Sequence, residues 1–129
     1  MSFDWQLYVS IAAKLLDGQR TNPNPREECL RTSISRYYYG VFCIARNHLK
    51  NQGEYLPDKE VHAYLRKVYI QSPNQFYNQI GKNLLKLWNK RRVADYDDDQ
   101  IISLFDTTAA HQITFNVIQN LKKIGAIGP

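Results

Sequence analysis

Apolar residues recur every three or four positions along most of this 129-residue chain, which is the spacing of one face of an α-helix. Pro, Gly and Asn residues separate five such windows and leave little room for strands. The pattern predicts an all-α fold of five helices, at about residues 4–17, 25–51, 58–70, 74–91 and 98–124. No internal repeat or long linker divides the chain, so residues 1–129 are expected to form a single domain.

The same pattern predicts which side chains face the core. The second helix is expected to be central, because residues 37–45 offer no polar face. The stripes of the other four helices are Trp5, Tyr8, Ile11, Ala12, Leu15 and Leu16; Val61, Tyr64, Leu65 and Val68; Phe76, Ile80, Leu84 and Leu87; and Ile102, Phe105, Ala109, Ile113 and Leu121. Arg91 continues the stripe of the fourth helix and is expected to point inward. The run from Asp97 to Asp99 is expected to cap the last helix and to supply its acidic first turn.

Composition narrows the functional classes only slightly. The formal charge of +5 permits an anionic partner without requiring one. Cys29 and Cys43 lie in one predicted helix, about 21 Å apart, so no disulfide is expected between them. The N-terminus has no leader-like pattern, and no run of eighteen apolar residues occurs, so we expect a cytoplasmic protein without a membrane segment.

Several kinds of site are disfavoured by the motifs. His48, His62 and His111 fall on different predicted helices without paired ligand spacing, so no metal is expected. The chain contains neither the P-loop pattern nor the dinucleotide-binding pattern of glycines. No cofactor is therefore expected.

Polar residues interrupt the apolar pattern at two places. Arg36 directly precedes the apolar part of the central helix and needs a partner, and the inward-pointing Arg91 is followed by Asp95 and Tyr96. One interpretation is an internal ion pair of Asp95 with Arg36 or Arg91. The other is that one arginine stays free and forms a phosphate pocket with Tyr96. We expect Arg36, Arg91 and Asp95 in one polar cluster between the second and fourth helices.

Taken together, the two segments resemble the signatures of the HEPN family of small helical domains. The branch that they resemble carries an S-R-x-Y-Y motif on the second helix and an R-x-x-A-D-Y motif after the fourth. The residues that fill these motifs are Ser35, Arg36, Tyr38 and Tyr39, and Arg91, Ala94, Asp95 and Tyr96. The similarity spans roughly residues 27–123, and His62 also resembles a histidine common on the third helix of this branch.

This resemblance implies a single five-helix HEPN-like bundle that forms a homodimer. HEPN proteins are commonly encoded beside small nucleotidyltransferases in toxin–antitoxin or phage-defence modules, and many are metal-independent ribonucleases. The resemblance therefore implies a nucleotide- or RNA-associated component of such a module, with a nucleotidyltransferase as its partner.

The sequence departs from the HEPN ribonucleases at one position. Those enzymes pair an arginine with a histidine after four to six intervening residues, and here Tyr96 follows Arg91 after four intervening residues. A phenol with a pKa of about 10 is a poor general base beside an imidazole of about 6.5, so strong ribonuclease activity is not expected. The candidate phosphate- or RNA-binding residues are Arg36, Arg91, Asp95, Tyr96, Ser35 and His62. The alternatives are a metal-independent HEPN endoribonuclease and a non-catalytic protein–protein interaction module.

Overall fold

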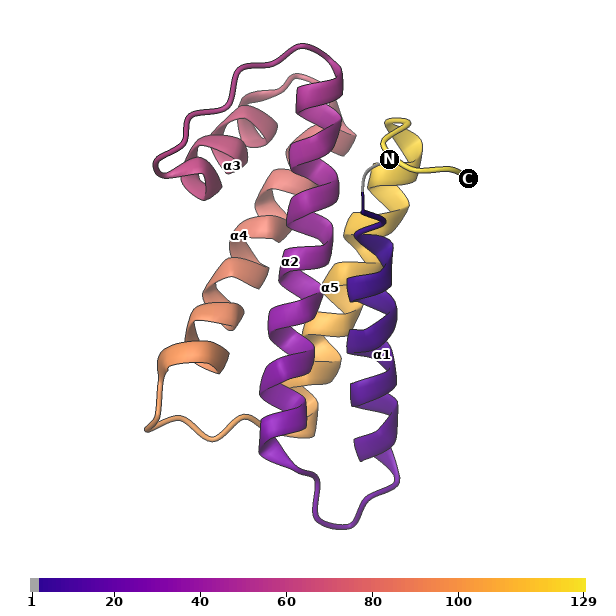
Figure 1. Cartoon of the computed structure of the whole chain (residues 1–129), viewed down its shortest axis with the longest axis vertical. Coiled ribbons are helices and arrows are strands. Elements are labelled where there is room, and N and C mark those ends of the chain that lie inside the picture. The colour runs from indigo at the N-terminus through magenta and orange to yellow at the C-terminus, as the bar shows by residue number, and fades with distance from the viewer. Residues whose placement is uncertain (1–2) are drawn as a thin grey trace.

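In the computed structural model, the described residues 3–129 form five α-helices and no strand, which confirms the all-α class and the five-helix bundle (Figure 1). The helices are α1 (Gln6–Arg20), α2 (Glu27–Asn51), α3 (Val61–Gln71), α4 (Gln75–Tyr96) and α5 (Leu104–Lys123). None of the helices in the described part of the chain combines the length and the apolar character needed to cross a bilayer. The expected single domain also includes residues 1 and 2, which lie outside the described residues.

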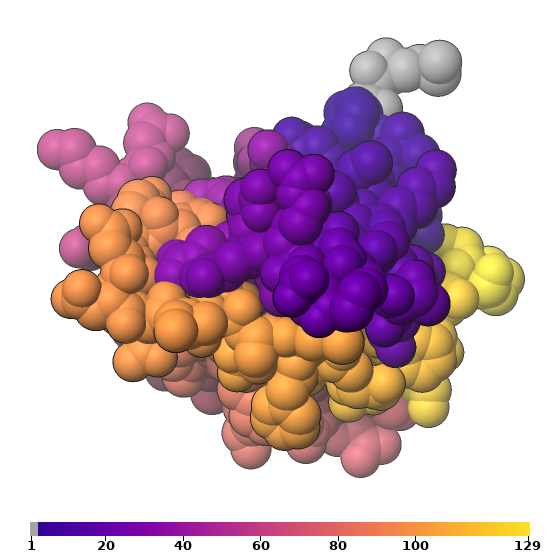
Figure 2. Space-filling model, turned by 90° about the horizontal axis from the view of Figure 1, so that it is seen from below, coloured from indigo at the N-terminus to yellow at the C-terminus, as the bar shows by residue number. Residues whose placement is uncertain are grey.

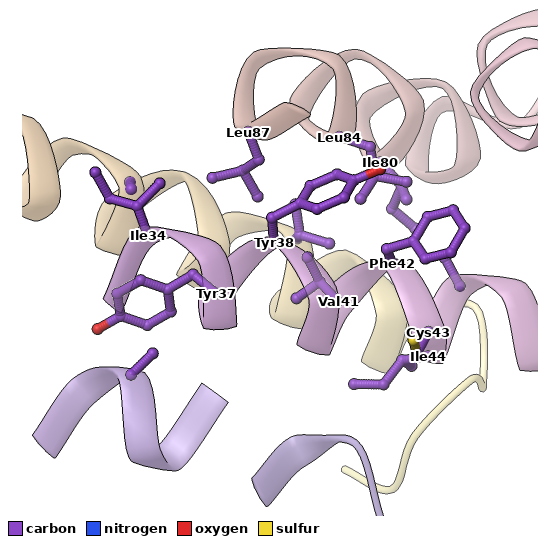
Figure 3. Packing of buried hydrophobic residues seen from close by; sticks show 14 of the residues in the cluster. Ile34, Tyr37, Tyr38, Val41, Phe42, Cys43, Ile44, Ile80, Leu84 and Leu87 are labelled. Atoms are coloured by element: carbon purple, nitrogen blue, oxygen red, sulfur yellow. The ribbon is translucent and has the colours of Figure 1, made fainter. Parts of the chain in front are cut away.

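Helix α2 is the centre of the bundle. It runs between α1 and α5 on one side and α3 and α4 on the other (Figure 1). Its side chains point in both directions: Tyr37 lies toward α1, whereas Tyr38 lies toward Leu84 and Ile80 of α4 (Figure 3). The absence of a polar face in the middle of α2 follows from this position between the other helices.

Three tyrosines are fully buried because each hydroxyl has a partner inside the fold. The hydroxyl of Tyr37 lies 2.7 Å from Nδ1 of His111, and burial, the largest cause, raises the pKa of this phenol to about 12. The Tyr69 hydroxyl donates to the carbonyl oxygen of Ala45 at 2.8 Å, which ties α3 to α2. Tyr38, the third of them, belongs to the candidate site described below.

Helix α5 begins later than the sequence pattern predicts. Ser103 accepts a hydrogen bond from the backbone N–H of Asp106, and the Asp106 side chain accepts one from the backbone N–H of Ser103. This capping box satisfies two backbone donors and fixes the helix start, so the expectation that Asp97–Asp99 cap the helix is wrong. The three aspartates lie instead between α4 and α5.

Some residues that the sequence pattern predicts to face the core are exposed instead. The buried line of α5 consists of Thr107, Ala110, Thr114, Val117 and Leu121, so the predicted core residue Phe105 is 80% exposed. Ile11 of α1 and Tyr64 of α3 are also exposed, because each lies at the edge of its stripe. Apolar spacing locates a helix face to within about one position, and packing against neighbouring helices decides the rest.

The connection between α4 and α5 is fastened to the start of α2 by Arg31. Its two terminal nitrogens donate to the carbonyl oxygens of Val93 (3.2 Å) and Ala94 (2.8 Å), Asp97 (3.0 Å) and Gln100. Its Nε donates to Glu27 at 2.7 Å, and Glu27 also accepts from the backbone N–H of residue 102. Seen from the end of the bundle, the orange residues of this connection lie against the purple start of α2 (Figure 2). Arg31 therefore fixes the chain on both sides of the polar residues that end α4.

Helices α3 and α4 cross closely at Gly81. A Cβ atom there would lie 2.6 Å from Cγ1 and 2.8 Å from the backbone nitrogen of Ile70. Since that nitrogen belongs to a packed helix, we expect Gly81→Ala to lower the free energy of unfolding by about 2 kcal/mol. Gly18 of α1 has no atom within 4 Å of such a Cβ, so Gly18→Ala should raise it by about 0.5–1 kcal/mol. Urea unfolding measures both, and a loss of equal size in the two variants would contradict the close crossing.

Candidate functional site

Arg91, in the last turns of α4, is the centre of the candidate site. It points inward as predicted and is only 8% exposed. Its Nε donates to Oδ2 of Asp95 at 3.0 Å, and its Nη2 donates to the hydroxyl of Tyr96 at 3.2 Å. The three residues lie four and five positions apart, so one helical turn aligns the guanidinium with both partners. Ser35 of α2 donates to the same oxygen of Asp95 at 3.3 Å.

Aromatic rings surround this guanidinium. Its central carbon lies 5.0 Å from the ring centre of Tyr39, 5.1 Å from that of Trp88 and 5.2 Å from that of Tyr96. Rings at this distance attract a cation through their electron-rich faces and restrict its side chain. Arg91 is thus held in one position, and the exposed ring of Tyr96, 71% accessible, forms the outer wall.

Arg36 does not join this cluster. Its guanidinium carbon lies 5.0 Å from the ring centre of Tyr8, on α1. The neighbouring residue Ser35 faces Asp95, and one step along a helix turns the side chain by about 100°. Within residues 3–129, Arg36 forms no ion pair, so its predicted place beside Arg91 and Asp95 is wrong.

His62 of α3 joins the site through rings contributed by α2 and α4. Its Nδ1 lies 2.5 Å from the hydroxyl of Tyr38, and its ring stacks on Phe42 with centres 4.0 Å apart. Its ring centre is also 4.8 Å from that of Trp88, the same indole that contacts Arg91. The structure therefore brings together two candidates, His62 and Arg91, that are far apart in the sequence.

The protonation states at this contact follow from burial and charge. Burial, followed by the positive charges of Arg91, Arg66 and Arg46, lowers the pKa of His62 to about 4. Burial also raises the pKa of the Tyr38 phenol above its ordinary value. At neutral pH both groups are uncharged, and they share a hydrogen bond whose donor depends on the imidazole tautomer.

The depressed pKa of His62 predicts a pH dependence of stability. Between about pH 4 and 6.5 the unfolded imidazole binds a proton that the folded one does not, so this contribution is present above pH 6.5 and is lost as the pH falls toward 4. His62→Gln retains a hydrogen-bond partner for Tyr38 and should flatten the fall in unfolding free energy over that range. His48, whose pKa burial also lowers, is present in both proteins, so their difference isolates His62. If the unfolding free energies of the two proteins fall in parallel as the pH is lowered, His62 is not the source of this pH dependence.

Sequence reasoning did not identify two residues of this cluster. Arg66 lies four residues after His62, and Trp88 lies three residues before Arg91. The guanidinium carbon of Arg66 is 5.0 Å from the ring centre of Trp88, and its Nη1 is buried without a hydrogen-bond partner among residues 3–129. Helical spacing from the two known candidates would have indicated both residues, because positions three and four apart share a face.

The chemistry that this cluster offers is the binding of an anion. Over residues 3–129 no three His, Cys, Asp or Glu side chains lie close enough together to hold a metal ion. The cluster has cationic nitrogens fixed by aromatic rings, one carboxylate that orients Arg91, and a neutral imidazole. Such groups hold phosphate oxygens well. No protein-family model, curated protein or solved structure was found to match this chain.

Proposed function

We propose that this protein is a HEPN-like, RNA- or nucleotide-associated protein that binds a phosphate group at Arg91. The observation that carries the proposal is the state of its guanidinium: Nε and Nη2 are held by Asp95 and Tyr96, while Nη1 has no hydrogen-bond partner among the described residues. A guanidinium oriented on two sides can offer its remaining donors to an anion without losing further side-chain entropy. The nearby ring of Tyr96 and the hydroxyl of the same residue suit a nucleotide better than a bare inorganic anion.

The proposed biological setting is a homodimer in the cytoplasm that belongs to a toxin–antitoxin or defence module with a nucleotidyltransferase partner. The surface next to the site supports the dimer. Ile101 and Phe105 are each 80% exposed, and beside them lies an open, largely apolar hollow of about 280 Å³ whose lining includes Val93 and Ile102. A surface with both a projecting apolar side chain and an apolar hollow can pair with a second copy of itself. Sedimentation at micromolar concentration tests this, and a monomer of 15.1 kDa would remove the dimer from the proposal.

Weak or absent ribonuclease activity is part of the proposal. Tyr96 occupies the place of the family's histidine, and a phenol holds its proton at neutral pH. The second candidate function, a metal-independent endoribonuclease, is favoured by the contact of His62 and Arg91 with the same indole. Against it, an imidazole with a pKa of about 4 is a weak base near neutrality.

Binding of a labelled RNA strand tests the proposed function. We expect Arg91→Gln to weaken binding at least tenfold, because it removes the oriented cation. The matched control is Arg92→Gln, which removes the same charge from an exposed position of the same helix. Fluorescence anisotropy at fixed salt measures the affinities. Equal effects of the two substitutions, or no binding of RNA or AMP by the unaltered protein, would contradict the proposal.

A further inference from the structure

Positive charge in this part of the bundle exceeds what the site at Arg91 accounts for. Arg66 of α3 has no ion pair within residues 3–129, and its Nη1 is buried without a partner. Among the described residues, the one carboxylate joined to the cluster is that of Asp95, and it is already bound to Arg91. Protein atoms enclose Nη1, but Arg66 as a whole is only half-buried, and its Nε and Nη2 are neither buried nor hydrogen-bonded among the described residues. These two nitrogens can therefore bind an anion that is not part of the chain, and such an anion would offset the cost of an unpaired cation.

The position of Arg66 relative to Arg91 is set by one indole. Both guanidinium carbons lie over the ring of Trp88, at 5.0 and 5.1 Å from its centre, so they are no more than about 10 Å apart. Neighbouring phosphates of one nucleotide strand can lie within this span. His62, 4.8 Å from the same ring centre, is neutral near pH 7 and adds no positive charge of its own to the two arginines.

The cationic surface continues beyond His62. Arg46 and Lys50 of α2 line an open hollow of about 190 Å³ that also includes Val61, the neighbour of His62. Asp58 lines the same hollow, and it forms no ion pair with either cation in the described part of the chain. The charges of Arg91, Arg66 and Arg46 all act on His62, so cations from α4, α3 and α2 lie near one another, which suits a chain of phosphates better than a single one.

We propose that Arg66 forms a second anion-binding position beside Arg91, and that the ligand is a single RNA strand that places successive phosphates on these two arginines. This inference rests on the proposed function, because it extends the same site. The exposed ring of Tyr96 lies next to the first position and offers a surface on which a base can stack. A mononucleotide would occupy only the position at Arg91.

The experiment compares two probes and four substitutions. The probes are a fluorescein-labelled octa-adenylate RNA, titrated over a range of sodium chloride concentrations, and AMP as its competitor. Arg66→Gln is matched by Lys67→Gln, an exposed neighbour on the same helix, and Arg91→Gln is matched by Arg92→Gln. Arg66→Gln should weaken RNA binding about tenfold and reduce the slope of log affinity against log salt by about 0.7, the value for one phosphate of a single strand. The affinity for AMP should stay within twofold, whereas Arg91→Gln should weaken both ligands.

The other possible results of this experiment show whether the second anion-binding position, the proposed function or both are wrong. If Arg66→Gln and Lys67→Gln change the RNA affinity equally while Arg91→Gln abolishes RNA binding, the second anion-binding position is excluded and the proposed function stands. If Arg66→Gln weakens AMP and RNA equally, the ligand is a single nucleotide and the strand is excluded. If the unaltered protein binds neither probe, the proposed function and this inference both fall.

A structural role for Arg66 makes a different prediction. Arg66→Met keeps an unbranched side chain over Trp88 and removes a donor that has no partner, so its thermal midpoint should stay within about 2 °C of the unaltered protein or rise. It should nevertheless show the same tenfold loss of RNA affinity. A fall of more than about 10 °C would make Arg66 a structural residue and overturn the inference.

Discussion

Arg31→Met should lower the free energy of unfolding by about 3 kcal/mol, the largest loss that we expect from a single substitution outside the apolar core. The side chain is 21% exposed and donates to four carbonyl oxygens and to Glu27. Methionine keeps the apolar stem but leaves these acceptors without a donor. The unfolding midpoint should fall by roughly 10 °C in a domain of this size.

Arg20→Met is the matched control for this substitution. Arg20 also pairs with a carboxylate, that of Asp17 at 3.1 Å, but the side chains are 43% and 71% exposed. An exposed pair contributes little, so the control should lose no more than about 0.5 kcal/mol. Equal midpoints for the two variants would show that water replaces the contacts of Arg31 without cost.

The hydrogen bonds of Arg31 also affect the candidate site. The carbonyl groups that it holds belong to Val93, Ala94 and Asp97, on either side of Asp95 and Tyr96. Loosening this segment should release the two side chains that orient Arg91. Arg31→Met should therefore also weaken RNA binding at temperatures where the variant is still folded.

Local periodicity predicted the parts of this structure that depend on a single helix. The five helices and the inward direction of Arg91 follow from the spacing of apolar residues, which a helix repeats every 3.6 positions. Arg31 gave no comparable signal. With Glu27 four residues before it, Arg31 resembles an ordinary surface pair, and its four carbonyl partners lie more than sixty residues away.

Features that depend on several helices were only partly predictable. Arg36 and Ser35 are adjacent in one motif, yet they face α1 and α4 respectively, because α2 is covered on both sides. The contact of His62 with Tyr38 and Trp88 joins three helices, and no spacing within one of them encodes it. Composition alone does not show which of the nine tyrosines are exposed, and Tyr37, Tyr38 and Tyr69 are fully buried.

Tyr96→His should add RNA cleavage to the proposed RNA-binding site. The hydroxyl of Tyr96 accepts from Nη2 of Arg91 at 3.2 Å, so an imidazole at this position would lie beside the cation that we propose binds the phosphate. Because Tyr96 is largely exposed, the new imidazole would escape the burial that lowers the pKa of His62 to about 4. A group that both accepts and donates a proton near neutrality contributes about 10² to 10⁴ in rate, and we expect a gain of about 10².

Three comparisons decide whether such a gain comes from this site. Adding Arg91→Ala to the Tyr96→His variant should abolish the gain, since the phosphate would lose its oriented cation. Tyr64→His places an imidazole on an exposed tyrosine of α3 and should leave cleavage at the level of the unaltered protein. All assays contain a metal chelator. If the unaltered protein already cleaves RNA, and His62→Gln removes that activity while Tyr96→Phe does not, then His62 is the base despite its burial, and the endoribonuclease is the correct function.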